Sequence, residues 1–129
     1  MPKTIILIDD DPDDLDIMKQ AIEAVDPQLF CVSFIYPDEA VKVLLRKEML
    51  IRPDFIFIDI NMPVMSGDKC LKALRQDRDF DTTPITLYST AMPPAVSEAL
   101  KHSGATHTFQ KPVKLKGYVE VLEKIFYQN

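Results

Sequence analysis

Carboxylates are concentrated near the start of this sequence, where six aspartates fall within eight residues. Part of this cluster has an ordinary structural use. Asp11 followed by a proline predicts a helix N-cap, and acids at Asp13 and Asp14 suit the positive end of a helix dipole. Asp9 and Asp10 come earlier, at the end of an apolar run that is typical of a strand, so capping does not explain them. These two carboxylates are therefore the first candidates for a chemical role.

Further polar residues follow other apolar runs in the same way. Asp59 comes directly after the run FIFI, and Lys111 lies just beyond the run THTF. Ser89 and Thr90 form a hydroxyl pair after the run ITLY. In open α/β sheets, ligands bind outside the carboxyl ends of the strands. We therefore expect these four side chains to meet the aspartate pair at one rim of a sheet.

The chemistry of such a rim favours magnesium-dependent phosphoryl transfer. Asp9, Asp10 and Asp59 carry three negative charges when all are ionised, whereas Lys111 returns only one positive charge. Because close carboxylates repel one another, a pKa would rise unless a cation joined them. Carboxylate oxygens with room for water suit Mg²⁺. A carboxylate can act as the nucleophile and form an aspartyl phosphate, while a metal ion, an ammonium and a hydroxyl position the phosphoryl oxygens.

Five apolar runs are predicted to form the strands that place these residues. The runs IILI and FIFI are apolar at every position, which is typical of parallel strands covered by helices on both faces. The last run is more polar and fits an edge strand. The predicted strands are Thr4–Ile8, Phe30–Tyr36, Phe55–Ile58, Ile85–Tyr88 and Thr106–Phe109.

Residues with helical spacing lie between and after these runs, and Pro12, Pro37, Pro93 and Pro94 stand where helices would begin. Five alternations of strand and helix predict an α/β fold with one doubly wound, five-stranded parallel sheet and helices on both faces. The apolar faces of the five helices are marked by Leu15, Met18, Ile22 and Val25; by Val41, Leu44 and Leu45; by Leu71 and Leu74; by Val96, Ala99 and Leu100; and by Leu115, Val119, Leu122 and Phe126.

Length and composition predict one domain, residues 1–129. The chain has 129 residues, which is enough length to bury a core without disulfides.

Charged residues make up 27% of the chain, and the net charge is −5. An acidic chain is a poor partner for nucleic acid or anionic membranes. Cys31 and Cys70 lie in apolar stretches, as expected of reduced thiols in a cytoplasmic protein. The apolar run near the N-terminus, 5–8, is far too short for a signal peptide or a membrane span. We therefore expect a cytoplasmic protein that binds neither nucleic acid nor membrane.

Four segments carry a family resemblance. They are the Asp pair in IILIDD, the segment FIFIDINMPVMSG, the Ser89 position in PITLYSTA, and the Lys-Pro in GATHTFQKP. Together these segments resemble the receiver domain of bacterial response regulators, the CheY-like family, over essentially the whole chain. The resemblance implies a flavodoxin-like sheet with strand order 2-1-3-4-5.

The resemblance also implies a metal and phosphorylation site. Asp59 would accept a phosphoryl group from a partner histidine kinase or phosphotransfer protein. Asp10 and Asp59 would ligate Mg²⁺ together with the backbone carbonyl of Asn61, and Asp9 would hold a metal-bound water. The domain would catalyse only its own phosphorylation and dephosphorylation, so we expect no other enzymatic activity.

By the same resemblance, Ser89 and Lys111 would contact the phosphoryl oxygens, and the Lys111–Pro112 peptide bond would be cis, which only X–Pro bonds adopt at low cost. Two residues depart from the family pattern. Thr90 lies beside Ser89 where a small alanine is commoner, and Thr108 stands where the family usually has an aromatic ring that rotates inward on activation. Coupling in this chain must then run through Ser89, Thr90 and the loop into the fourth helix.

The chain continues for only about one helix after the lysine, so we expect a stand-alone module without an output domain. It would signal by protein contact or phosphorelay, through a surface formed by the fourth helix, fifth strand and fifth helix. The partner would be a second copy of the chain or an unknown downstream target. An apolar stripe on the fifth helix is broader than one core face needs, so half of it is expected to face a partner; it contains Tyr118, Val121, Leu122, Ile125 and Phe126.

Two alternative functions follow from the same residues. The pattern Asp9-x-Asp11 superficially matches the nucleophile motif of haloacid-dehalogenase-type phosphohydrolases. Against that interpretation, Asp13 stands where that family commonly has Thr or Val, and the chain is short for that fold. The other alternative is a pseudo-receiver that folds but is not phosphorylated, which the intact acidic rim and Lys111 disfavour.

Overall fold

The computed structural model describes residues 3–50 and 52–127, and in them the chain alternates strand and helix throughout. Five parallel strands form one sheet in the order β2-β1-β3-β4-β5, which confirms the expected fold class and strand order. The elements are β1 Thr4–Ile8, α1 Pro12–Val25, β2 Phe30–Phe34, α2 Pro37–Leu45, β3 Phe55–Asp59, α3 Gly67–Arg75, the short 3₁₀ helix η1 Arg78–Phe80, β4 Ile85–Ser89, α4 Pro94–His102, β5 His107–Gln110 and α5 Leu115–Tyr127.

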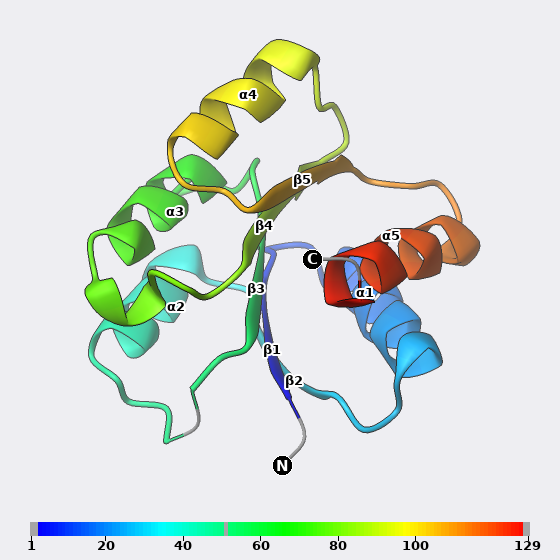
Figure 1. Cartoon of the computed structure of the whole chain (residues 1–129), viewed down its shortest axis with the longest axis horizontal. Coiled ribbons are helices and arrows are strands. Elements are labelled where there is room, and N and C mark those ends of the chain that lie inside the picture. Colours follow the sequence, from blue (N-terminus) through cyan, green and yellow to red (C-terminus); the bar gives the residue numbers. More distant parts are fainter. Residues whose placement is uncertain (1–2, 51, 128–129) are drawn as a thin grey trace.

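Helices cover both faces of the sheet (Figure 1). Helices α1 and α5 pack together on one face, and α2, α3 and α4 lie on the other. We call these two groups the α1/α5 layer and the α2/α3/α4 layer. Because successive strand residues point to opposite faces, each strand contributes to both layers. This arrangement explains why IILI and FIFI are apolar at every position.

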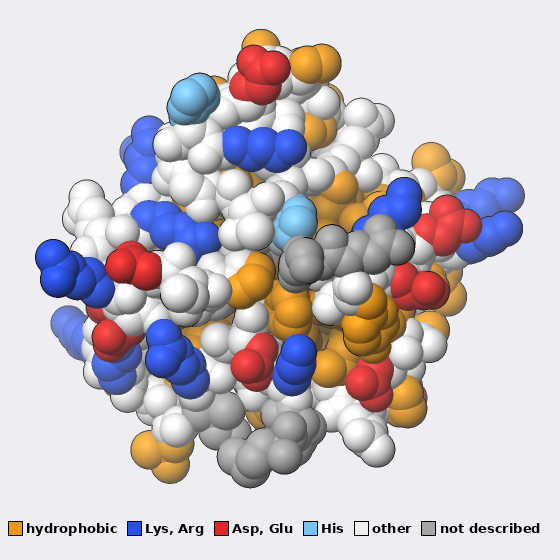
Figure 2. All heavy atoms as spheres, viewed as in Figure 1, with side chains coloured by type: hydrophobic (Ala, Val, Ile, Leu, Met, Phe, Trp, Pro, Cys, Tyr) orange, Lys and Arg blue, Asp and Glu red, His pale blue; other side chains and the backbone are white. Residues whose placement is uncertain are grey.

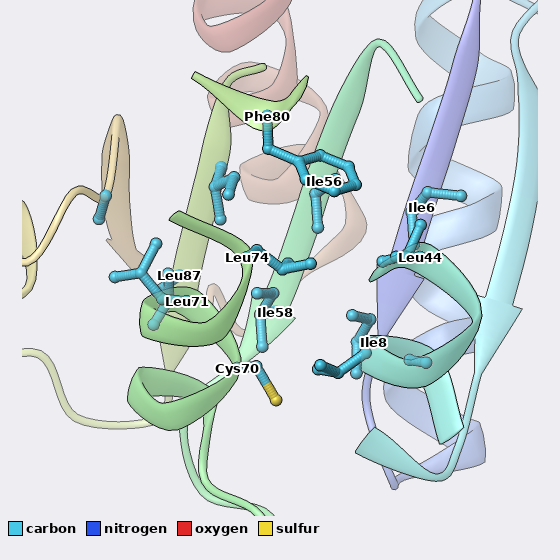
Figure 3. Packing of buried hydrophobic residues seen from close by; sticks show 14 of the residues in the cluster. Ile6, Ile8, Leu44, Ile56, Ile58, Cys70, Leu71, Leu74, Phe80 and Leu87 are labelled. Atoms are coloured by element: carbon cyan, nitrogen blue, oxygen red, sulfur yellow. The ribbon is translucent and has the colours of Figure 1, made fainter. Parts of the chain in front are cut away.

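The two layers have different cores. The α2/α3/α4 layer is filled mainly by branched aliphatic side chains. Figure 3 shows Ile6, Ile8, Ile56, Ile58 and Leu87 from the strands and Leu44, Leu71 and Leu74 from the helices, together with the thiol of Cys70 and the ring of Phe80. The α1/α5 layer is rich in aromatic rings, which come from Phe55, Phe57, Tyr88, Phe109, Tyr118 and Phe126.

Helix starts follow the predicted chemistry. Helices α1, α2 and α4 have proline in the first turn, as the sequence indicated. The side chain of Asp11 caps α1 by accepting a hydrogen bond from the backbone N–H of Asp13. This satisfies a donor that the helix itself cannot satisfy. The predicted structural use of Asp11 is thereby confirmed.

Four of the five predicted strands differ from the structure at a boundary. Strands β3 and β4 each run one residue further than predicted, to Asp59 and Ser89, and β5 extends to Gln110. Strand β2 ends at Phe34, and Tyr36 is the N-cap of α2, because Pro37 begins that helix and turns the chain away from the sheet. Strand β5 begins at His107 because the Thr106 side chain, in place of a regular strand partner, accepts the backbone N–H of Ile85. The predicted edge position of β5 is confirmed.

Other expectations concern the thiols and the membrane. Cys31 and Cys70 are both free, in agreement with the prediction of reduced cysteines. Within 3–50 and 52–127, the helices are too short and too polar to cross a membrane. Acidic and basic side chains are both scattered over the face seen in Figure 2, so charge is not segregated there.

Candidate functional site

Strand alternation decides which layer each rim residue faces. Ile8 and Ile58 point into the α2/α3/α4 layer, so Asp9 and Asp59, which follow them, lie on the side of the α1/α5 layer. Tyr88 also faces the α1/α5 layer, and the next residue, Ser89, faces the other side. The carboxylates and the hydroxyl of the rim therefore approach the same site from opposite layers.

Three carboxylates converge at the carboxyl ends of β1 and β3. Asp9, Asp10 and Asp59 each offer an oxygen, and these atoms all lie within 4.8 Å of one another. Asp9 and Asp59 are buried, whereas Asp10 is partly exposed. They border an open hollow of 460 Å³ whose lining comprises Asp10, Asp11, Pro12, Asp14, Asp59, Asn61, Thr90 and Lys111. The structure thus brings together the residues that the sequence singled out.

Lys111 is the positive centre of the site. Its ammonium Nζ lies 3.3 Å from Asp59 Oδ1 and 3.6 Å from Asp9 Oδ2, and it donates a 2.6 Å hydrogen bond to Asp14 Oδ2. Burial acts to lower the pKa of Lys111, but the bond to Asp14 and the charges of Asp9 and Asp59 together outweigh it and raise that pKa. Lys111 therefore remains an ammonium at physiological pH.

Asp14 is a site residue that sequence reasoning missed. Its place in the sequence indicates only an interaction with the helix dipole, yet its carboxylate makes the shortest of the three carboxylate contacts to Lys111. A signal was present, because Asp14 lies in the first turn of the helix that begins directly after the aspartate pair. Asp14 orients the ammonium and leaves it within reach of Asp59.

Asp9 is held by two donors inside the protein. Its Oδ1 accepts the backbone N–H of Asp11 at 3.0 Å, and its Oδ2 accepts the hydroxyl of Tyr88 at 2.9 Å. Burial and the nearby charge of Asp59 raise the pKa of Asp9 to about 6, against the opposing effects of the Asp11 N–H, Lys111 and Tyr88. The buried carboxylate would be more readily ionised with a cation beside it.

Asp59 is the last residue of β3, and its carboxylate faces the Lys111 ammonium. Burial raises the pKa of Asp59, while Lys111 and the backbone N–H of Asn61 act to lower it. Gly67 packs against the backbone that follows: a Cβ there would lie 2.4 Å from the Asp59 carbonyl oxygen. The glycine in the FIFIDINMPVMSG segment therefore allows α3 to start directly beneath the site.

Ser89 and Asn61 are linked at the opposite side of the hollow. The Asn61 side-chain Nδ2 donates to Ser89 Oγ at 2.9 Å, and the backbone N–H of Ala91 approaches the same oxygen at 3.4 Å. Thr90 is exposed and lines the hollow. The structure thus places all three predicted residues at the rim, and the Ser89–Asn61 contact is an addition to what the sequence indicated.

Thr108, which stands in the position of the family's aromatic residue, contacts α4. Its Oγ1 lies 2.6 Å from Ser97 Oγ, so the two hydroxyls share a hydrogen bond between β5 and α4. Helix α4 buries only Leu100. This hydroxyl pair is therefore a substantial part of what holds the helix to the sheet.

Two expectations near the C-terminus need correction. The 111–112 peptide bond is trans, as are all described X–Pro bonds. The trans form is favoured by about 0.5–1 kcal/mol in such bonds. The backbone N–H of Lys111 donates a 2.8 Å hydrogen bond to the Ser89 carbonyl. The broad α5 stripe belongs to the core, because its residues are buried or pack against the α1/α5 layer; they are Tyr118, Val121, Leu122, Ile125 and Phe126. The stripe therefore gives no support for a partner surface.

The donor set of the hollow fits a hard divalent cation. Its ligand atoms are oxygens only, and its carboxylates outnumber the single ammonium. Burial raises the pKa values of Asp9 and Asp59, although Lys111 acts to lower them. Oxygen-rich sites that leave room for water are the type that binds Mg²⁺. The residues present are thus suited to the expected metal.

Comparison with known proteins identifies the family. The family model of the response regulator receiver domain matches residues 5–123. The chain belongs to this family. Receiver domains are signalling modules of two-component systems rather than classical enzymes. The match favours this interpretation over a haloacid dehalogenase, and the burial of Asp9, with both its oxygens accepting hydrogen bonds, argues against Asp9 as a nucleophile.

Relatives in sequence include full-length and longer regulators. Stress response regulator protein 1 of Candida albicans is 31% identical over 110 residues, which are 85% of this chain and 38% of that protein. The polar-differentiation response regulator DivK of Brucella anthropi is 23% identical over 124 residues, 95% of each protein. The chain thus spans well under half of the Candida albicans regulator and nearly all of DivK.

Solved structures share the fold. The chemotaxis response regulator CheY4 of Vibrio cholerae is 26% identical, with a TM-score of 0.81 over 97% of this chain and 99% of that one. The phosphorylated cyanobacterial phytochrome response regulator RcpA is 19% identical, with a TM-score of 0.87 over 100% of this chain and 97% of that one. The fold of the receiver domain is therefore common to proteins with little sequence identity.

Proposed function

We propose that this receiver domain is a magnesium-dependent phosphoacceptor and that Asp59 is its phosphorylation site. The observation that supports this most directly is the position of the Asp59 carboxylate. It lies beside an open hollow, 3.3 Å from the Lys111 ammonium and within 4.8 Å of ligand oxygens on Asp9 and Asp10. A nucleophile, a cation site and a positive side chain are thereby combined in one place.

The residues around the hollow have separate roles in holding the metal. Asp10 and Asp59 would supply carboxylate ligands, the backbone carbonyl of Asn61 a third ligand, and Asp9 a hydrogen bond to a metal-bound water. Mg²⁺ bound there would neutralise charge that otherwise repels the incoming phosphoryl group. Asp9 is suited to an outer role because its two oxygens are already turned toward Asp11 and Tyr88.

In the transfer itself, an oxygen of Asp59 attacks the phosphorus of a phosphohistidine on a histidine kinase or phosphotransfer protein. The phosphorus–nitrogen bond breaks, its electron pair returns to the imidazole nitrogen, and that nitrogen takes a proton. Lys111 and Ser89 bind the oxygens of the transferred group, with Thr90 at the mouth of the hollow. In dephosphorylation, water attacks the same phosphorus and restores the Asp59 carboxylate with release of phosphate.

Phosphorylation at Asp59 can be tested by intact-mass spectrometry after treatment with acetyl phosphate and Mg²⁺. The wild type is expected to gain one phosphoryl group, and Asp59→Asn to gain none because the nucleophilic oxygen is replaced by an amide. Asp26→Asn is a matched control, since Asp26 lies at the far end of α1 and its carboxylate bonds only locally to Gln28. Undiminished labelling of Asp59→Asn, or labelling at Asp9, would contradict the proposal, and an unlabelled wild type would support a pseudo-receiver.

The phosphorylated domain would signal to a protein partner, a second copy or another target, through the surface of α4, β5 and α5. The weak anchoring of α4 supports this, because one buried leucine and the Ser97–Thr108 hydroxyl contact leave the helix free to shift. Hydrogen exchange with and without beryllofluoride and Mg²⁺ tests it. We expect changed protection from Ala91 to His102, whereas changes confined to 59–67 would exclude this route.

A further inference from the structure

Tyr88 is a buried polar residue that the proposed function does not use. It is fully buried in β4, in register with Asp59 of the adjacent strand β3. Its side chain extends beyond that neighbour and donates its hydroxyl to Asp9 Oδ2, at the end of β1, at 2.9 Å. The phenol therefore reaches across one strand to bind a carboxylate of the site.

The structure assigns to Tyr88 the role of a positioning residue, whose hydroxyl holds Asp9 in the orientation that the metal site requires. This inference rests on the proposed function and extends it to a residue outside the hollow. A buried carboxylate needs hydrogen-bond donors for both oxygens. The Asp11 N–H serves Oδ1, and Tyr88 serves Oδ2.

The Lys111 ammonium cannot replace the Tyr88 hydroxyl as a hydrogen-bond donor to Asp9. Lys111 Nζ lies 3.6 Å from Asp9 Oδ2, beyond hydrogen-bond distance, and its short bond is made to Asp14. Without the phenol, Asp9 would keep one donor for Oδ1 and none within bonding distance for Oδ2. Its side chain would then be free to rotate away from Asp10 and Asp59.

The ring of Tyr88 makes the hydroxyl a rigid support. It stacks on Phe109 with ring centroids 5.3 Å apart and an interplanar angle of 12°. Phe109 in turn meets Tyr118 of α5 edge-on at 6.5 Å. A phenylalanine would fill the same space, so packing alone does not require the oxygen, and a buried phenol without a partner would be unfavourable.

Magnesium titration of the unphosphorylated full chain by calorimetry tests this role. Tyr88→Phe keeps the ring and removes the oxygen, so the dissociation constant for Mg²⁺ is expected to rise about threefold or more. This is less than the loss for a group that supports a direct metal ligand, because Asp9 would hold a metal-bound water. Tyr127→Phe is the control, because it removes a phenolic oxygen from an exposed ring that meets Phe126 at the C-terminal end of α5, away from Asp9. Its dissociation constant is expected to stay within about twofold of the wild type.

A double-mutant comparison shows whether Tyr88 acts through Asp9. In an Asp9→Asn background, Tyr88→Phe should weaken Mg²⁺ binding by less than about twofold, because the carboxylate that it positions is gone. An equal loss in both backgrounds would mean a general effect on the fold and would overturn the inference. Wild-type affinity in Tyr88→Phe would overturn it as well.

A measurement on the wild type covers the case in which Tyr88→Phe does not fold. The chain has four tyrosines, so the ¹³Cζ resonance of Tyr88 can be assigned by elimination with Phe variants of Tyr36, Tyr118 and Tyr127. Addition of Mg²⁺ should shift the Tyr88 resonance more than the other three, and an unmoved resonance would overturn the inference.

The outcomes distinguish this inference from the proposed function. A wild type that binds Mg²⁺ and takes up phosphate, with Tyr88→Phe unchanged, refutes the role of Tyr88 alone. A wild type that binds no Mg²⁺ refutes the proposed function too.

Discussion

The two helical layers of this receiver domain differ in both composition and contact. The α1/α5 layer packs aromatic rings between two helices that contact each other along the sheet, and it reaches the site through Tyr88. The α2/α3/α4 layer is aliphatic, and its last helix, α4, buries a single leucine and is otherwise tied to β5 through the Ser97–Thr108 hydroxyl contact. One layer is therefore suited to hold the chemical groups still, and the other to move.

Strand alternation gives this difference a functional meaning. Asp9 follows β1 and Asp59 ends β3, both on the side of the α1/α5 layer, whereas Ser89 and Thr108 lie on the side of α4. The groups proposed to bind the metal and accept phosphate thus stand against rigid packing. Ser89, whose hydroxyl is proposed to bind the phosphoryl group, lies beside the weakly held helix α4. A small displacement there breaks few packing contacts.

The largest expected effect compares one core residue from each layer. Phe57→Ala should lower the free energy of unfolding by about 3–5 kcal/mol, because it removes a fully buried ring from the α1/α5 layer. Leu100→Ala should cost about 2 kcal/mol, since Leu100 is the only buried residue of α4. Urea denaturation measures both values. Hydrogen exchange should show faster exchange confined to α4 in Leu100→Ala, and faster exchange throughout in Leu100→Ala would mean that α4 is as tightly integrated as α5.

Asp9→Asn should raise the free energy of unfolding of the metal-free protein, because the buried charge of Asp9 destabilises the α1/α5 side of the site. The pKa of Asp9 is about 6 when folded against an ordinary value of 3.8, so the folded state binds the proton more tightly. Ionisation between pH 4 and 6 therefore destabilises the fold, by up to about 3 kcal/mol above pH 6. Because the substitution also weakens the pairing with Lys111, we expect a gain of about 1–3 kcal/mol at pH 7.5.

Denaturation in EDTA at several pH values checks this expectation. The wild type should lose stability as the pH rises from 4 to 6 relative to Asp9→Asn, whose curve should lack that contribution. Parallel curves for the two proteins would show that Asp9 is not strained by its burial.

The smallest expected effect concerns the hydroxyl contact of α4. Ser97→Ala should lower the protection of α4 amides by about 1 kcal/mol in hydrogen exchange, because it removes one hydrogen bond, and should leave α5 unchanged. Thr108→Val removes the other partner and serves as the matched variant. The double variant should exchange no faster than either single variant, and additive effects would show that the two side chains do not act as a pair.

Much of the fold and of the site could be predicted before the structure. Short apolar runs and the residues with helical spacing between them predict the five strands and five helices. The rule that parallel strands end at one edge gathers Asp10, Asp59, Ser89 and Lys111. Boundaries were less predictable, as the early end of β2 shows. The cis form of the 111–112 bond was a wrong prediction, because cis and trans X–Pro bonds differ by only about 0.5–1 kcal/mol and the surroundings decide.

The polar groups at the strand ends of this protein can be identified in the primary sequence, because each apolar run and the polar residue after it are local features. How those groups are supported depends on the tertiary fold. The bond from Tyr88 to Asp9 joins residues 79 positions apart, and the bond from Lys111 to Asp14 joins residues 97 apart. No local pattern encodes such pairs, since they depend on which side chains fill the space between the sheet and its helices once the strands are in register. Asp14 and Tyr88 therefore look like a helix-end acid and a strand aromatic until the fold places them at the site.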